Sequence, residues 1–461
     1  MEKQGMMSRL SQYIADAGAR SLPEAVVEKA KHHILDTIAA MVSGARLKPG
    51  EMAIKFIRTQ GGIAEAQVIG ADFLTTAINA ATANGFMAHA DETDDQHGPS
   101  FTHPGAAIVP AALAVAEREN SSGEAFLRAV VVGYDVCCRL ARFMVTGDNR
   151  PRGHATHSVG GTFGATVAAA SLMKLNPRQV RYALAYAGQQ ASGITTWVQD
   201  AEHVEKAFVF GGMGARNGVM GALFVQQGFS GEEDVFSGAG NFLESFCQGI
   251  GALPEWIDNL GSHYEIIETN IKSFCVGFPL QAPADAMTSL IQEHKVTAEQ
   301  VKKVDVHLPP QAAQLVNNRT MPDVNCQYIM AVMLLDGKLD FEAAHAYERM
   351  ADPKVLEVQR RVNLIEDLRF TAEEKKQPGL VRIHLADGRT LEKYVPVFKG
   401  KAENPMNREE VAVKTLDLIQ DILGKDRSDV LLRMIWGLEK MGSVRELRPL
   451  LALPIKAKIP R

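Results

Sequence analysis

The sequence of 461 residues has few cysteines, few aromatic residues and no surplus of positive charge. Its five cysteines include no CxxC pair and are odd in number, so we expect a reduced, cytoplasmic protein without disulfides or a zinc knuckle. The 49 Lys and Arg residues stand against 54 Asp and Glu residues, so neither nucleic acid nor an anionic membrane is expected as a partner. The longest apolar run, residues 106–116, contains Pro110 and is too short to span a bilayer.

Common nucleotide-binding and hydrolase motifs are missing as well. No GxxxxGK[ST] or GxSxG pattern occurs, so the sequence does not support a phosphate-binding loop or a serine hydrolase. The glycines within residues 211–218 have the wrong spacing for a dinucleotide-binding GxGxxG loop after a strand. We interpret them as positions where helices pack closely.

The chain before about residue 268 has the spacing of helices. Residues 21–24 (Ser-Leu-Pro-Glu) have the pattern of a capping box, and the helix that follows is expected to end at Gly44. Ala- and Leu-rich periodic stretches then occur at residues 75–90, 105–118, 123–144, 159–174, 177–191 and 214–228. No alternation of β-branched residues interrupts them, so we expect this part to be entirely helical.

The pattern changes near residue 270. Val304, Val306 and Leu308 alternate with polar residues, as in a half-buried strand. The same alternation at 381–385 runs into an Asp-Gly hairpin signal and a second strand through 391–395. We expect helices between these strands, at 282–294 and 352–363.

Helical spacing returns after residue 405. The sequence therefore predicts a mainly α protein, in which residues 1–268 and 403–461 form a large all-helical domain and residues 269–402 form an inserted, smaller α+β lid domain. Because the chain crosses twice between the two domains, a cleft between them is expected.

Residues 89–103 are the most unusual segment for chemistry. They contain four carboxylates and three histidines and no Lys or Arg, namely His89, Asp91, Glu92, Asp94, Asp95, His97 and His103. Such crowding raises carboxylate and imidazole pKa values, which suits groups that exchange protons near neutral pH. A solvated acidic loop with a helix cap is one alternative. A divalent-metal site is another, although no fixed ligand spacing such as HExxH is present.

A pair of histidines marks a second candidate site. His154 and His157 lie at a Gly-rich entry to an Ala-rich helix, where free backbone N–H groups favour an anion. Helix capping by Thr156 or Ser158 is the alternative explanation.

Two isolated lysines form the third candidate. Lys206 and Lys272 have mostly apolar, aromatic or Gly-rich neighbours in the sequence, which favours a desolvated lysine paired with an anion. A lysine that simply faces solvent is the default alternative.

Four segments, taken in order, resemble the MmgE/PrpD family. They are HADETDDQH with the following THPGA, RGHATHSVGGTFGA, the KAF and GARNG stretch, and IKSFC. The family includes 2-methylcitrate dehydratases, cis-aconitate decarboxylases and an iminodisuccinate epimerase, and the likeness covers most of residues 8–445. It implies a large helical domain, a smaller α+β lid, a homodimer, and a site between the domains that uses no cofactor and no metal.

The resemblance assigns roles within the acidic segment. The family's HxxDxDDTH pattern is matched except that Glu92 replaces the usual Asp and Gln96 replaces the usual Thr. Both residues are implied to bind substrate. The THPG motif makes His103 the best candidate for catalysis, oriented by Asp94 or Asp95.

The remaining implied site residues come from the later motifs. The family's active-site histidine before the Ala-rich helix falls on His154 or His157. The two family lysines match Lys206 and Lys272, which together with Arg216 are expected to hold substrate carboxylates and to stabilise negative charge that develops during the reaction.

The implied chemistry is proton abstraction next to a carboxylate of a small di- or tricarboxylic acid. A hydro-lyase similar to 2-methylcitrate dehydratase is the favoured reaction, and an epimerase or isomerase is the runner-up. Decarboxylase members carry another histidine shortly after the second lysine, whereas residues 275–279 here read Cys-Val-Gly-Phe-Pro, so decarboxylation is less favoured. Because Glu92 and Gln96 depart from the family pattern, a catalytically inactive carboxylate-binding homologue is a further alternative.

Overall fold

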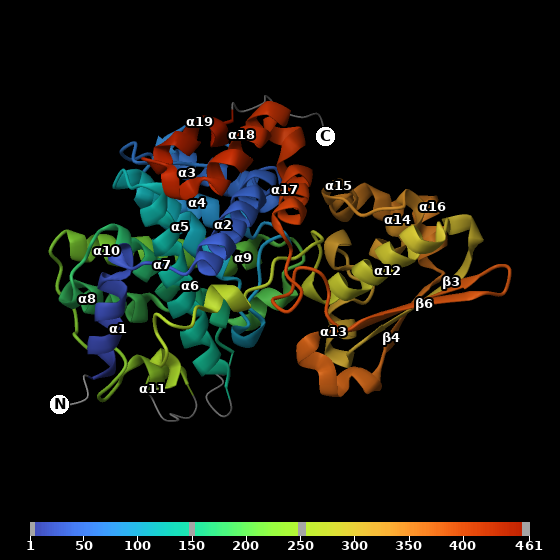
Figure 1. The fold of residues 1–461 in the computed structure, drawn as a ribbon, viewed down its shortest axis with the longest axis horizontal. Helices are drawn as coiled ribbons and strands as arrows, with labels where there is room; N and C mark the ends of the chain where they lie inside the picture. Colours follow the sequence, from blue (N-terminus) through green and yellow to red (C-terminus); the bar gives the residue numbers. More distant parts are fainter. Residues whose placement is uncertain (1–4, 147–152, 248–254, 454–461) are drawn as a thin grey trace. The chain divides into compact units, whose positions relative to one another are not determined.

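The computed structural model describes residues 5–146, 153–247 and 255–453, and this part of the chain is mainly α-helical (Figure 1). The mainly α class predicted from the sequence is confirmed. The chain forms two compact units. Unit 1 consists of Met1–Ala90, Asp94–Thr269 and Leu418–Arg461, and unit 2 consists of Asp91–Thr93 and Asn270–Asp417.

Long helices make up most of unit 1. They include α1 (Met6–Ala15), α2 (Glu24–Gly44), α3 (Lys48–Gln60), α4 (Ala77–Ala88), α5 (Pro104–Arg118), α6 (Gly123–Val145), α7 (Thr156–Leu172), α8 (Pro177–Gln190) and α10 (Met213–Gln226). The predicted helical stretches are all present, each with bounds within three residues of the expected ones. Small buried side chains, mainly alanine, fill their facing surfaces and let the helices pack closely.

Two local predictions for unit 1 are wrong. Helix α2 has Pro23 at its N-cap position and makes no side-chain cap, so Ser21 does not form a capping box. The predicted end at Gly44 is confirmed. Unit 1 is also not entirely helical, because β1 (Ala66–Gln67) and β2 (Leu74–Thr75) pair antiparallel. These strands are too short to produce a visible alternation in the sequence.

A π-helical turn, η5 (Phe208–Gly212), precedes α10 and packs against α4. A Cβ atom added to Gly211 would lie 2.0 Å from the carbonyl oxygen of Gly85, so the two backbones approach too closely for any side chain. The interpretation of this glycine-rich stretch as a helix-packing feature is therefore confirmed.

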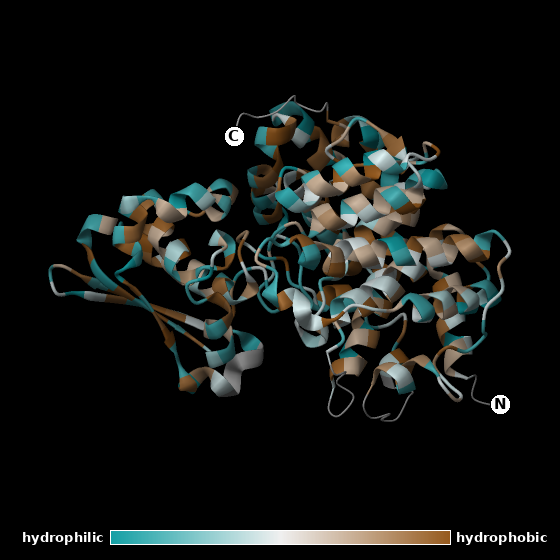
Figure 2. Ribbon diagram, turned by 180° about the vertical axis from the view of Figure 1, so that it is seen from behind, coloured by the Kyte–Doolittle hydropathy of each residue, from teal (hydrophilic) through white to brown (hydrophobic). Residues whose placement is uncertain are grey.

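A four-stranded sheet with the order β4-β3-β5-β6 forms the frame of unit 2. Its strands are β3 (Val301–Leu308), β4 (Val362–Glu366), β5 (Gly379–Leu385) and β6 (Thr390–Val395). Strand β3 runs antiparallel to β5 and parallel to β4. Apolar side chains of the sheet share one core with α12 (Gln281–His294), α14 (Cys326–Asp336) and α16 (Pro353–Gln359), and Figure 2 shows hydrophobic residues along these elements.

The sequence predicts most of unit 2 but misplaces the end of one helix. The β5–β6 hairpin is confirmed, with Gly388 at a φ of 93° in its turn. The helix expected at 352–363 ends at Gln359, and Val362 instead begins β4. The compact unit 2 continues to Asp417, inside α17 (Arg408–Leu423), whereas the lid domain expected from the sequence ends at residue 402. The later helices α18 (Lys425–Trp436) and α19 (Arg448–Leu451) belong to unit 1.

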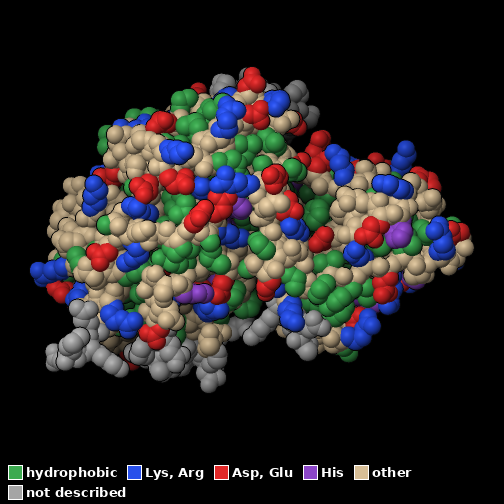
Figure 3. All heavy atoms as spheres, in the orientation of Figure 1, with side chains coloured by type: hydrophobic (Ala, Val, Ile, Leu, Met, Phe, Trp, Pro, Cys, Tyr) green, Lys and Arg blue, Asp and Glu red, His purple; other side chains and the backbone are tan. Residues whose placement is uncertain are grey.

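One helical stretch of the described residues, Val204–Gln226, is long and apolar enough to cross a membrane by length and composition alone. Its apolar window is 72% buried inside the protein, as expected for a core helix. On the face drawn in Figure 3, positive and negative side chains are interspersed.

Candidate active site

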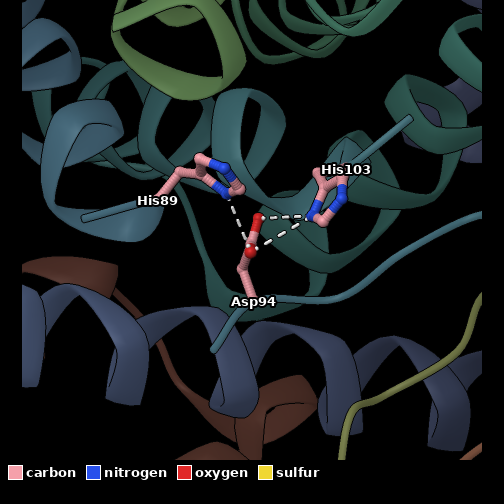
Figure 4. Close-up of side chains that lie close together, drawn as sticks. All are labelled: His89, Asp94 and His103. Atoms are coloured by element: carbon pink, nitrogen blue, oxygen red, sulfur yellow. Dashed lines mark hydrogen bonds and ion pairs between the residues drawn. The ribbon is translucent and has the colours of Figure 1, made fainter. Parts of the chain in front are cut away.

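Asp94 lies between two imidazole rings in unit 1 (Figure 4). The Nδ1 atom of His89 lies 2.9 Å from Asp94 Oδ1, and the Nδ1 atom of His103 lies 3.2 and 3.1 Å from the two carboxylate oxygens. The side chains of His89 and Asp94 are fully buried, whereas that of His103 retains 9% exposure. Asp94 thus contacts the Nδ1 atom of His103 rather than its Nε2 atom.

The ends of two helices place these side chains. Helix α4 stops immediately before His89, and α5 begins immediately after His103. Pro104 opens α5 because proline needs no hydrogen-bond acceptor and already has a helical φ. Within the connection, an isolated β-bridge joins His97 to Thr102 and turns the chain back towards α5.

Asp95 makes different contacts from those of Asp94. Its carboxylate accepts hydrogen bonds from Tyr134 Oη at 2.6 Å and from the backbone N–H of Gly105 at 2.9 Å, and it lies 2.7 Å from His33 Nδ1. A Cβ atom at position 105 would lie 2.8 Å from both Asp95 and Tyr134, so glycine is required there. Asp95 thus fixes the helix turn that follows His103.

Burial and neighbouring groups shift the pKa values of His89 and Asp94. It lowers the pKa of His89 to about 4, against the opposing influence of Asp94. Burial also favours the neutral acid at Asp94, but the charges and hydrogen bonds of His89 and His103 outweigh it and hold the pKa of Asp94 well below its usual range. At neutral pH, Asp94 is therefore an anion in contact with both imidazoles.

Phe210, in the π-helical turn η5, is packed between imidazoles. Its ring stacks on His89 at a centroid distance of 4.2 Å and on His157 at 3.8 Å, and lies 5.2 Å from the ring of His103. A π-helical turn is rare and is frequently found at functional sites. Here it places one aromatic ring in contact with all three histidines.

The structure distinguishes the two histidines that the sequence could not. His157, in the first turn of α7, has its ring 5.6 Å from that of His103. His154 instead pairs with Ile194 in an isolated β-bridge and packs against Phe246. Burial, with the charges of neighbouring groups, lowers the pKa of His157 well below its usual range. Arg152 of the same motif lies outside the described residues.

Lys206 supplies a positive charge beside the histidines. It lies in the short helix α9 (Val204–Ala207), with its Nζ atom 5.2 Å from the ring centroid of Phe210 and 5.5 Å from that of Trp197. Its charge is among the influences that lower the pKa values of His89 and His157. The structure therefore brings this predicted cation together with the histidine cluster.

Two other predicted residues of unit 1 have different surroundings. The Arg216 guanidinium donates a hydrogen bond to Asn217 at 3.0 Å and lies 5.3 Å from the ring centroid of Phe208. Gln96 is buried, with 8% exposure. The next residue, His97, lies 2.7 Å from Ser100 Oγ through its Nδ1 atom.

Lys272 and Glu92 lie together in unit 2. The fully buried Lys272 ammonium donates to the backbone carbonyl of Glu92 at 2.8 Å and lies 3.4 Å from its carboxylate. An ammonium held in this way stabilises the chain at residue 92, only two residues before Asp94 in the sequence. The lysine predicted to bind substrate thus has a partner within the protein.

Unit 2 holds the neighbouring residues as well. His345 Nε2 lies 2.8 Å from Asp91, and the Lys414 ammonium donates to the carbonyl of Thr93 at 2.9 Å. Burial opposes a charge on His345, but the hydrogen bond and charge of Asp91 outweigh it and raise the pKa of His345 to about 9. The tripeptide Asp91–Thr93 is therefore fixed by three cationic side chains of unit 2.

Sequence reasoning missed several of these residues. Phe210 and Trp197 were not singled out because apolar side chains carry no motif of acid–base chemistry. A weak signal was present, since Trp197 is one of only three tryptophans in the chain. His345 gave no signal because its partner, Asp91, is far away in the sequence.

His89, Asp94 and His103 also have ligand atoms close enough together to hold a metal ion. In this arrangement both Nδ1 atoms are directed at the Asp94 carboxylate, so hydrogen bonds already account for the geometry. The donor set therefore gives no specific support to the metal alternative.

A buried carboxylate that holds two imidazoles beside a lysine and aromatic rings has the groups that acid–base chemistry requires. The sequence comparisons give its family: the MmgE/PrpD N-terminal domain matches residues 8–252 and the MmgE/PrpD C-terminal domain matches residues 274–440. The chain belongs to the MmgE/PrpD family.

The curated relatives include lyases of this family. A cis-aconitate decarboxylase of Aspergillus terreus is 25% identical over 99% of this chain and 98% of its own length. A cis-aconitate decarboxylase-like protein, oryM, of Aspergillus oryzae is 26% identical over 96% and 97%. The cis-aconitate decarboxylase of Homo sapiens is 25% identical over 94% and 92%. The similarity thus extends over both units.

Proposed function

We propose that this protein is a lyase that acts on a small di- or tricarboxylic acid by proton transfer at a carbon next to a carboxylate. The observation that carries the proposal is the pairing of His103 with the buried Asp94 carboxylate, beside Lys206. An imidazole fixed through Nδ1 by a carboxylate presents Nε2 as a proton carrier. No cofactor is needed for such a step.

The protein's own residues divide the work in the proposed mechanism. His103 transfers the proton, and Asp94 orients its ring and stabilises the imidazolium. Lys206 binds a substrate carboxylate and stabilises the negative charge that develops on it. His157, kept neutral by its surroundings, accepts or donates a second hydrogen bond on the other side of Phe210.

Loss of CO2 is the reaction that the relatives favour, although it was only an alternative in the sequence-based prediction. In a tricarboxylic acid such as cis-aconitate, the carbon–carboxylate bond breaks and its electron pair forms a new double bond. The electrons of the original double bond then take a proton at the neighbouring carbon. One proton is consumed and one CO2 leaves, so an imidazolium at His103 supplies what the reaction needs.

Loss of water, the reaction that the sequence favours, is the second candidate because of the residues that follow Lys272. Decarboxylase members of the family carry a histidine shortly after the second lysine, whereas this chain reads Cys-Val-Gly-Phe-Pro at residues 275–279. A Cβ atom at Gly277 would lie 3.1 Å from Val324 Cγ1, so a larger side chain requires Val324 to move. In this reaction His103 removes a proton next to a carboxylate and returns it to the leaving hydroxyl group, so that one water is lost and no net proton is taken up or released.

A substrate panel separates the reactions. The protein is incubated with cis-aconitate, citrate, 2-methylcitrate and iminodisuccinate, and the products are identified by NMR and mass spectrometry. Release of CO2 from cis-aconitate supports the first candidate, and a new alkene from a hydroxy acid supports the second. Solvent deuterium uptake without a change of composition indicates an epimerase. Binding of these acids without any conversion contradicts the proposed enzyme and indicates an inactive binding homologue.

A further inference from the structure

Residues 192–202 border the histidine cluster of unit 1, which consists of His89, His103 and His157. The segment pairs with the entry to α7, where the Ala155 N–H donates to the Gly193 carbonyl and the Thr195 N–H donates to the Gly153 carbonyl, both at 3.0 Å. It includes the short helix η4 (Thr195–Gln199). Most of its side chains are exposed, including the apolar Ile194 at 55%.

Trp197 is the residue of this segment that contacts the cluster. Its ring lies 4.7 Å from Phe210 in an edge-on arrangement and 5.4 Å from His157, also edge-on. The Lys206 ammonium lies 5.5 Å from the centre of the same ring. Trp197 thus contacts Phe210, the imidazole of His157 and the ammonium of Lys206 in the proposed site.

The indole N–H of Trp197 is buried and has no hydrogen-bond partner among the residues that the structure describes. A buried donor without an acceptor is costly, and structural tryptophans usually satisfy this group. Beside Lys206, the acceptor that suits both groups is a carboxylate oxygen, which binds an ammonium and an N–H donor together.

We propose that Trp197 is a substrate-binding residue whose indole N–H donates a hydrogen bond to the carboxylate that Lys206 also binds. The segment 192–202 then forms one wall of the site, and the edge of the Trp197 ring limits the size of the group next to that carboxylate. This inference rests on the proposed function and extends it to the choice of substrate.

The first test compares two tryptophan substitutions. Trp197→Phe keeps an aromatic ring but removes the N–H donor. Trp256→Phe is a matched control in unit 1. The Trp256 indole nitrogen is likewise buried without a hydrogen-bond partner among the described residues, and the Trp256 ring packs against Phe236. We expect kcat/KM to fall about 10- to 100-fold for Trp197→Phe, as for loss of a hydrogen bond to a charged group. Thermal unfolding of both variants checks that they are folded.

The second test uses tryptophan fluorescence and needs no change at Trp197. The variant Trp256→Phe/Trp436→Phe leaves Trp197 as the sole tryptophan. Titration with cis-aconitate, or with the acid that the panel shows to be turned over, is expected to change its emission with saturation near KM. No change in emission at a concentration that saturates turnover contradicts the assignment.

The outcomes separate the two proposals. Equal kcat/KM for Trp197→Phe and Trp256→Phe, in a wild type that turns over a carboxylic acid, overturns only the role of Trp197. A wild type that converts no acid of the panel overturns the proposed function itself.

Discussion

Replacing Asp94 with asparagine tests the acid–base pair without changing its shape. The carboxylate is fully buried and lies within 3.2 Å of Nδ1 in both His89 and His103. An amide loses the negative charge and presents one acceptor in place of two. Its NH2 group also points a donor at a ring nitrogen that is already a donor.

The expected loss can be estimated from these contacts. A hydrogen bond to a charged group contributes about 1.5–3 kcal/mol, and each 1.36 kcal/mol is a factor of ten in rate. Loss of the bond that stabilises the His103 imidazolium, together with a misdirected ring, is expected to lower kcat about 10²- to 10³-fold. KM should change less than about threefold, because Asp94 is buried behind the imidazoles and does not bind substrate.

Steady-state kinetics on the substrate identified by the panel measures this effect. Asp135→Asn is the control, since Asp135 is another fully buried carboxylate of unit 1 and accepts a hydrogen bond from the Glu265 N–H at 2.8 Å. Both variants should lose about 1–2 kcal/mol of unfolding free energy, but only Asp94→Asn should lose kcat. A folded Asp94→Asn variant with the wild-type kcat refutes the role given to this carboxylate.

Four further outcomes are expected. Lys206→Gln should raise KM about 10- to 100-fold, with partial recovery in Lys206→Arg. Initial-rate kinetics in which both variants match the wild type would contradict the proposal that Lys206 binds a substrate carboxylate. Burial lowers the pKa values of His33 and His89 to about 4, so the unfolded chain binds their protons first, and the unfolding free energy should fall as pH drops from about 6.5 to 4. Denaturant unfolding should show that slope weakened in His33→Asn, and an unchanged slope speaks against this reasoning. The interaction of His345 with Asp91, which raises the pKa of His345 to about 9, stabilises unit 2 fully below about pH 6.5. This contribution is lost as the pH rises to about 9. Thermal melts at several pH values should show that His345→Asn abolishes this dependence. Exhaustive chelation should leave the rate unchanged, whereas a loss that an added divalent metal restores would favour the metal alternative.

The helices of unit 1 could be predicted from sequence because their signals are local. Apolar spacing and terminal Gly or Pro residues indicated α5 and α8 within a residue of their ends. Strand β4 could not be predicted in the same way. Its residues follow α16 directly, and they become a strand only by pairing with β3, about 60 residues earlier in the chain. The sequence likewise gives no signal for the end of unit 2 at Asp417, because this residue lies inside α17.

The proximity of candidate site residues was predictable where they are neighbours in the sequence. Asp94 and His103 were identified together because nine residues separate them in an unusual segment. The proximity of His157 to His103 and Phe210 could not be predicted, because it arises only in the folded chain. The contacts of Asp95 with the Gly105 N–H and of Lys272 with the Glu92 carbonyl could not be predicted, because a backbone partner leaves no motif in the sequence. The homodimer, the cytoplasmic location and the absence of a cofactor stay predictions.

The most direct test of the account follows solvent hydrogen into the product. Wild-type protein and a His103→Ala variant are incubated in D2O with the acid that the panel identifies, and deuterium is located by NMR. We expect the wild type to place deuterium at a carbon next to a carboxylate during turnover or exchange, and the His103→Ala variant to lose at least about 10²-fold of that rate. Equal deuterium incorporation by a folded His103→Ala variant would contradict the central claim that this imidazole carries the proton.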